Sequence, residues 1–201
     1  MKRQLATGLT LLFFMPMIAI GVLLGFNAFQ HKELPVLSTL PEFNFTERTG
    51  KPFGSADLKN KVWVGSFVFS SCSAQCPLIV VELQKIQKAL RFKDNFRIVS
   101  FTLDPLTDTP ERLSSYANQA KADPYKWLFL TADNKKTQEL VQKGFVLPSV
   151  ESEKADGDIV HSSKLVLVDG GGRVRGYYDS LEAQQMKQLL KDAKTLIRGT
   201  L

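Results

Sequence analysis

Residues 61–90 read KVWVGSFVFSSCSAQCPLIVVELQKIQKAL, and this stretch decides the fold. Its first nine residues, 61–69, are almost continuously apolar or aromatic, which is typical of a strand buried on both faces of a sheet. A loop follows over 70–75, and Pro77 then opens a helix. Apolar residues recur along that helix at helical spacing: Leu78, Val81, Leu83, Ile86 and Leu90. A buried strand that leads through a short loop into a helix predicts an α/β domain.

The chain after this unit continues the alternation of strands and helices. The sequence predicts strands over 96–103, 127–131, 160–168 and 173–178, and helices that begin at Pro110 and span 135–144 and 181–197. Asp169-Gly170-Gly171-Gly172 predicts a hairpin between the last two strands. A short hairpin with its turn at 49–50 precedes the whole series. Parallel crossover units followed by an antiparallel pair predict a mixed central sheet with helices on both faces.

The first 31 residues differ in character from the rest. Lys2 and Arg3 come first, and no Lys, Arg, Asp or Glu follows from residue 4 to residue 31. The apolar run over 5–26 would span about 33 Å as a helix, enough to cross a bilayer core. A cleaved signal peptide is the alternative, but its apolar region is usually shorter and ends in small residues at alternate positions.

We therefore expect an uncleaved anchor over 1–31, a linker over 32–42 and one domain over 43–201. Positive residues at the N-terminus favour a cytoplasmic position for that end. This predicts a single-pass protein of the bacterial inner membrane whose C-terminal domain lies in the periplasm.

The net charge of +6 and the pI near 9.3 do not by themselves indicate a nucleic-acid partner. Removing Lys2 and Arg3 leaves 24 basic residues against 20 acidic ones, and these are dispersed rather than gathered in runs. We predict no nucleic-acid binding. The two cysteines exclude a disulfide-rich scaffold and a four-cysteine zinc site.

Chemically capable residues gather in three places. Cys72 and Cys76 flank a loop that opens a helix, where the helix dipole favours a thiolate that can attack a disulfide or bind a soft metal; a static disulfide is equally open. His161 stands at the start of a predicted strand, where a lone histidine is more commonly a surface residue or a hydrogen-bonded core residue, but it is the only histidine well inside the predicted domain. The loop over 104–110 follows another strand, and its simplest interpretation is loop closure with helix capping by Asp108 or Thr109.

Together these residues resemble the Sco (also SenC or PrrC) family of cytochrome c oxidase assembly proteins. The resemblance covers most of 42–199. It rests on the anchor, on a buried strand that leads into C-x-x-x-C-P over 72–77, on DP-x-x-DTPE over 104–111, on W-x-x-LT over 127–131, and on VHS over 160–162 before the hairpin. It implies a thioredoxin-like fold.

The resemblance also implies a function and a site. Cys72, Cys76 and His161 would hold one Cu(I) or Cu(II) ion, and the protein would be a metallochaperone for the copper-bearing subunit of cytochrome c oxidase. Other copper carriers or thiol–disulfide proteins would be its further partners. Two features depart from the family pattern: residues 73–75 are Ser-Ala-Gln where many members carry a proline or an acid, and Lys164 puts a cation near His161.

Three alternatives remain open. A thiol–disulfide oxidoreductase that reduces the cysteines of a copper-site partner would need Cys72 and Cys76 but not His161. A peroxidase of the same broad fold would need a solitary cysteine and a nearby arginine, yet no arginine occurs between Arg48 and Arg91. A binding module with a structural disulfide is the third.

Overall fold

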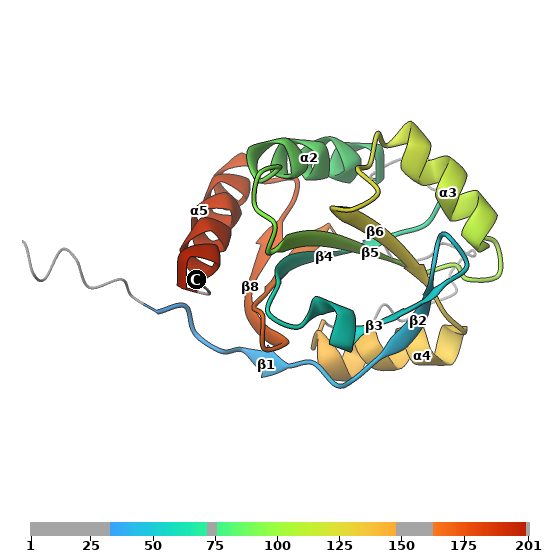
Figure 1. Ribbon diagram of the computed structural model, residues 1–201, viewed down its shortest axis with the longest axis horizontal. Coiled ribbons are helices and arrows are strands. Elements are labelled where there is room, and N and C mark those ends of the chain that lie inside the picture. Colours follow the sequence, from blue (N-terminus) through green and yellow to red (C-terminus); the bar gives the residue numbers. More distant parts are fainter. Residues whose placement is uncertain (1–32, 72–75, 148–162, 200–201) are drawn as a thin grey trace, which may run out of the picture. The chain divides into compact units, whose positions relative to one another are not determined.

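The computed structural model describes residues 33–71, 76–147 and 163–199, and the residues from Leu34 onwards form one compact unit. Its centre is a mixed sheet of eight strands in the order β1-β8-β7-β4-β5-β6-β2-β3 (Figure 1). β4, β5 and β6 run parallel, and every other pair is antiparallel. The strand bounds are β1 Ser38–Thr39, β2 Asn44–Glu47, β3 Pro52–Gly54, β4 Val62–Val68, β5 Phe96–Thr102, β6 Trp127–Thr131, β7 Lys164–Val168 and β8 Arg173–Asp179.

Helices cover both faces of this sheet, as predicted. One face carries α2 (Cys76–Ala89), α3 (Pro110–Gln119) and α5 (Ala183–Gly199), and the other carries the short helix η1 (Ser55–Leu58), α4 (Asn134–Glu139) and the π-helical turn η2 (Leu140–Gly144) (Figure 1). The side chains of β4 alternate between two apolar clusters: Val62 and Val64 pack with α2, while Trp63 and Phe67 pack with η2. All seven residues of β4 are buried, which explains the continuous apolar run.

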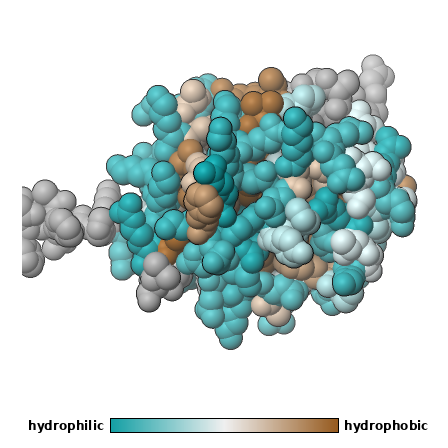
Figure 2. Space-filling view, turned by 45° about the horizontal axis from the view of Figure 1, so that its top comes forward, coloured by the Kyte–Doolittle hydropathy of each residue, from teal (hydrophilic) through white to brown (hydrophobic). Residues whose placement is uncertain are grey.

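The buried face of α2 is narrower than predicted. Ile79, Leu83, Ile86 and Leu90 form its buried stripe. Their steps of four, three and four residues follow one helix face. Leu78 and Val81, which the sequence analysis counted in this pattern, fall beside the stripe and are 56% and 45% exposed. The face of the molecule that carries α2 is mainly hydrophilic, with small apolar areas between the polar ones (Figure 2).

The sheet extends into the predicted linker. Ser38 and Thr39 form β1, and the flanking N–H groups of Leu37 and Leu40 donate to carbonyls of the β8 side at 2.8 and 2.9 Å. The guanidinium of Arg175 also donates to the carbonyl of Leu34. Residues 34–40 of the predicted linker therefore pack against the β8 side of the sheet.

The predicted helix over 135–144 consists of two parts. α4 ends at Glu139, and a π-helical turn continues to Gly144. This wider turn is followed by Phe145, whose ring lies 5.2 Å from that of Phe67 and 6.1 Å from that of Trp63. A Cβ on Gly144 would come within 2.9 Å of the Pro41 ring, so the close approach of the N-terminal segment requires glycine there.

The remaining predictions agree with the structure where it describes the chain. The strand over 127–131 is reproduced with both bounds, and Thr109 caps α3 with Pro110 at its first position. The strand predicted over 160–168 begins at Lys164, and residues 160–162 lie outside the described residues. In the described part of the chain no helix combines the length and apolarity needed to cross a membrane. The predicted anchor over 1–31 lies outside that part.

Candidate metal centre

The three predicted ligands lie at or beyond the limits of the described chain. Cys72 and His161 fall outside the described residues, and Cys76 is described only as the first backbone position of α2. Within the described ranges no three His, Cys, Asp or Glu side chains form a group that could hold a metal ion. The structure therefore describes the end of the sheet to which the segments with the predicted ligands are joined.

We call this end of the sheet the carboxyl edge and define it by Val68, Thr102, Lys164 and Asp179. β4 and β5 end there side by side, because Val68 pairs with Thr102. β7 begins there, since it runs antiparallel to β4 with Gly65 opposite Val166, and its first residue Lys164 pairs with the last residue of β8, Asp179. Residues 69–71 and 103–109 leave from this edge, and Ser163 leads into β7 there.

A buried carboxylate ties two of these segments together. Asp108 is fully buried, and its two oxygens accept from the backbone N–H of Ser70 at 3.2 and 3.1 Å. The Thr102 hydroxyl donates to the same carboxylate at 2.5 Å and accepts from the N–H of Asp104 at 3.0 Å. Asp108 thus closes the loop after β5 and holds the start of the loop after β4, while the capping role belongs to Thr109.

Arg112 completes this network from the first turn of α3. Its Nε donates to the Ser70 hydroxyl at 2.6 Å and lies 4.0 Å from an Asp108 oxygen. The guanidinium is half exposed, whereas its carboxylate partner is fully buried. A cation therefore stands beside Ser70, two residues before Cys72. The peroxidase alternative asked for an arginine near the cysteines, and one distant in sequence does approach this loop, although the chain carries two cysteines rather than a solitary one.

The cation that the sequence analysis placed near His161 is paired. Lys164 Nζ lies 3.2 Å from an Asp179 oxygen. Burial alone would raise the pKa of Asp179, but hydrogen bonds from Leu181 N–H and the Ser163 hydroxyl, together with Lys164, hold it below its ordinary value. The charge of Lys164 is thus largely compensated on the β8 side, which reduces its field at the segment that precedes β7.

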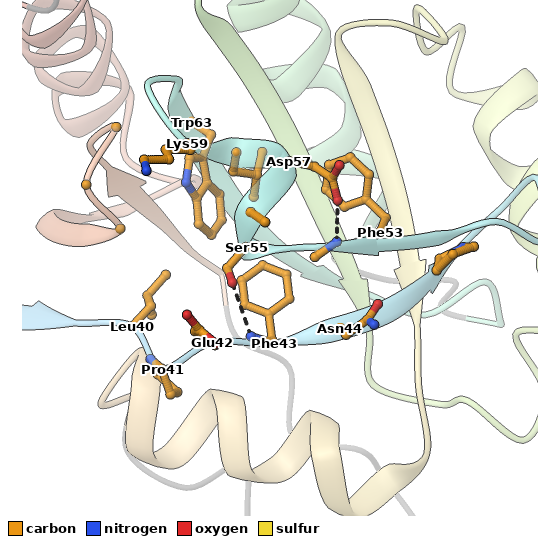
Figure 3. A pocket seen from close by; sticks show the side chains of 17 residues that line it. Leu40, Pro41, Glu42, Phe43, Asn44, Phe53, Ser55, Asp57, Lys59 and Trp63 are labelled. Atoms are coloured by element: carbon orange, nitrogen blue, oxygen red, sulfur yellow. Dashed lines mark hydrogen bonds between the residues drawn. The ribbon is translucent and has the colours of Figure 1, made fainter.

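A hollow bordered by described residues lies at the other end of β4, beside the β7–β8 turn. Figure 3 shows the side chains that line it. The hollow has a volume of about 910 Å³ between the segment 40–44, η1 and the β7–β8 turn, with Trp63 as part of its wall. Asp57 accepts from Gly54 N–H at 2.8 Å, and Ser55 accepts from Phe43 N–H at 3.4 Å. These two polar side chains are thus bonded within the protein, and none of the described residues that line the hollow is a cysteine or a histidine.

The family model described as SCO1/SenC matches residues 32–198, which is most of the sequence. The chain belongs to the SCO1/SenC family. The resemblance drawn from the motifs is thereby confirmed at the level of the family.

Solved structures of SCO1/SenC proteins share its fold. A SCO1/SenC family lipoprotein from Bacillus anthracis is 30% identical with a TM-score of 0.74, over 81% of this chain and 96% of that one. BsSco, a member of the Sco family of cytochrome c oxidase assembly proteins in which a disulfide switch was identified, is 27% identical with a TM-score of 0.74, over 84% and 99%. Copper-bound ScoI from Bradyrhizobium japonicum is similar in fold at 21% identity and a TM-score of 0.63, over 79% and 99%.

These comparisons confirm the mixed α/β fold of SCO1/SenC proteins, which is thioredoxin-like. The assignment of Cys72, Cys76 and His161 as ligands stays a prediction, as do the anchor and the boundaries of the linker. Sequence reasoning interpreted the loop over 104–110 as loop closure with helix capping and missed the contact of Asp108 with Ser70. Motif spacing carries no signal for that contact, because it joins residues 38 positions apart.

Proposed function

We propose that this chain is a membrane-tethered copper metallochaperone of cytochrome c oxidase assembly, and that Cys72, Cys76 and His161 hold one copper ion. Membership of the SCO1/SenC family supports the copper chemistry, since a related protein of this fold is known with copper bound. Two thiolates and an imidazole suit Cu(I) and can also hold Cu(II). Three protein ligands leave a position open, through which copper can pass to a partner such as the copper-bearing oxidase subunit.

The observation that carries this proposal is the arrangement of the carboxyl edge. Cys72 follows the end of β4 by four residues, and His161 precedes the start of β7 by three. Extended chain covers about 3.5 Å per residue, so these segments reach roughly 14 Å and 11 Å from their strand ends. Since neighbouring strands lie about 4.8 Å apart, the two reaches overlap. Residue 76, where α2 begins, closes the same loop.

A copper titration of the full-length chain in detergent tests the ligand set. We expect one copper ion per chain and Cu(II)–thiolate absorption that is lost in Cys72→Ser and Cys76→Ser. His161→Ala should weaken binding of Cu(II) and shift this absorption. His31→Ala is the matched control, because His31 is the other histidine of the chain and lies at the end of the predicted anchor. If His161→Ala titrates like His31→Ala, the ligand assignment is wrong.

The location is part of the same proposal. Residues 5–26 would anchor the protein in the bacterial inner membrane with the domain in the periplasm. We expect the full-length chain to stay with membranes after alkaline extraction, and the domain to be digested by protease added to spheroplasts. A chain without residues 1–31 that remained with the membranes to the same extent would contradict the anchor.

Thiol–disulfide exchange is the second candidate function, favoured by the disulfide switch found in BsSco. The reduced pair Cys72–Cys76 would give two electrons and two protons to a partner disulfide, leaving a disulfide on this chain and a dithiol on the partner. This activity needs both cysteines and not the histidine. Retained exchange with a partner disulfide in His161→Ala would therefore separate it from copper delivery.

A further inference from the structure

We propose that Asp108 is a positioning residue for the cysteine pair, acting through Ser70, which Arg112 also holds. This inference rests on the proposed function in so far as that function assigns the chemistry to Cys72 and Cys76. The argument starts from burial. Asp108 is fully buried at the carboxyl edge, although an ionised carboxylate is costly to bury unless it is well hydrogen-bonded. Hydrogen bonds from neighbouring residues must therefore replace the water that the buried carboxylate has lost.

Those partners connect the cysteine loop to the rigid part of the sheet. Thr102, the last residue of β5, donates to Asp108 at 2.5 Å, so the carboxylate is fixed to a central strand. Ser70 then donates its backbone N–H to both carboxylate oxygens. The first loop residues after β4 are thus fixed from a neighbouring strand, two residues before Cys72. Partners of this kind, one step removed from the reacting atoms, set the orientation of the groups that react.

Arg112 holds the same loop residue from a third element. It donates to the Ser70 hydroxyl at 2.6 Å and stands 4.0 Å from the nearest Asp108 oxygen. Asp108 and Arg112 therefore fix Ser70 through its backbone N–H and its hydroxyl, two residues before Cys72. Removing either one should loosen the start of the cysteine loop and change the balance between the reduced and oxidised cysteine pair.

The test measures that balance on the copper-free, full-length chain. The Cys72–Cys76 dithiol reacts with oxidised glutathione to give the protein disulfide and two molecules of reduced glutathione, and the equilibrium constant follows from the glutathione ratio at half-oxidation. We expect Asp108→Asn to change this constant at least threefold, which is about 14 mV for two electrons. A change of less than threefold would overturn the inference.

Asp169→Asn is the matched control. Asp169 is also a buried carboxylate with arginine partners, but it lies in the β7–β8 turn at the other end of the sheet. Both variants should unfold at lower temperature, whereas only Asp108→Asn should move the thiol–disulfide constant. An equal shift in Asp169→Asn would show that loosening of the fold alone moves the constant, and would also overturn the inference.

Arg112→Gln covers the case in which Asp108→Asn does not fold. The Arg112 side chain is half exposed, and after its replacement Asp108 keeps the hydrogen bonds from Thr102 and Ser70. We expect at least a threefold change in the same constant, and a smaller change would refute the network's role. Because copper is absent from this experiment, its result is independent of the proposed delivery function. If the unmodified chain binds no copper, only the proposed function is contradicted. If the unmodified chain binds copper but the thiol–disulfide constant is the same in the variants, only the inference about Asp108 is contradicted.

Discussion

Replacement by valine should destabilise the domain at Thr102 but not at Thr137. Both threonines are buried, at 1% and 2% exposure, and valine has nearly the same shape. The Thr102 hydroxyl donates to Asp108 and accepts from the N–H of Asp104. Among the described residues, the Thr137 hydroxyl oxygen has no hydrogen-bond partner. The pair therefore separates the loss of hydrogen bonds from the change of side chain.

The size of the effect follows from these partners. A hydrogen bond to a charged group contributes about 1.5–3 kcal/mol and a neutral one about 0.5–1.5 kcal/mol. Thr102→Val should therefore lower the free energy of unfolding by about 2–4 kcal/mol. For a domain of this size that corresponds to a fall in Tm of about 4–16 °C. Thr137→Val removes a buried hydroxyl without a partner, so it should leave Tm unchanged or raise it by a few degrees.

Thermal unfolding followed by tryptophan fluorescence provides the assay. Trp63 and Trp127 are both buried, at 1% and 0% exposure, so their emission reports the loss of the core. The full-length chain in detergent is heated at pH 7 beside both variants. A fall in Tm for Thr137→Val as large as that for Thr102→Val would refute the reasoning, because the hydrogen bonds would then not account for the loss.

Three further changes have defined outcomes. Burial would raise the pKa of Asp169, but hydrogen bonds from its arginine partners and from the turn N–H groups hold this pKa below its ordinary value. The carboxylate therefore contributes stability above about pH 4, and this contribution is lost as the pH falls further. Asp169→Asn should make Tm less dependent on pH between pH 5 and pH 3. Burial and the hydrogen bond to Asp192 raise the pKa of Tyr178, so the folded state loses stability as pH rises above about 10, and Tyr178→Phe should reduce that loss in alkaline unfolding. A Cβ on Gly170 would lie 2.9 Å from backbone, whereas on Gly171 its nearest neighbour is at 3.4 Å, so Gly170→Ala should cost about 1–3 kcal/mol and Gly171→Ala less in urea unfolding.

The elements that the sequence predicts are those whose signals are local. The apolar run over 61–69 predicts a strand, and the Thr109-Pro110 pair predicts a helix start. Both predictions are correct because burial on both faces and helix capping depend on adjacent residues. β1 gave no such signal. Its two residues, Ser38 and Thr39, become a strand only because the edge of β8 offers partners. The exposure of Leu78 was missed for the same reason, since only tertiary packing selects which stripe of α2 faces the sheet.

The candidate site divides in the same way. The motifs predict Cys72, Cys76 and His161 as one set of ligands, and the order of the strands would allow these three residues to lie close together. The contact of Asp108 with Ser70 could not be predicted, because an aspartate in a D-x-x-x-D-T-P loop is equally well explained as a helix cap. Only the burial of Asp108 and the position of the Ser70 N–H distinguish the two roles.

Two of the buried carboxylates, Asp108 and Asp169, hold different parts of the chain. Asp169 pairs with Arg175, which is 9% exposed, and with Arg173, which is half exposed. Arg175 also contacts the carbonyl of Leu34, so the Asp169 cluster joins the β7–β8 turn to the N-terminal segment. Asp108 instead accepts from the Thr102 hydroxyl and the Ser70 N–H, so it joins the loops that follow β4 and β5. Both carboxylates have a half-exposed arginine nearby, so the exposure of the cation does not distinguish them. The difference lies in the segment that each carboxylate holds, and for this reason we expect only Asp108→Asn to move the thiol–disulfide constant.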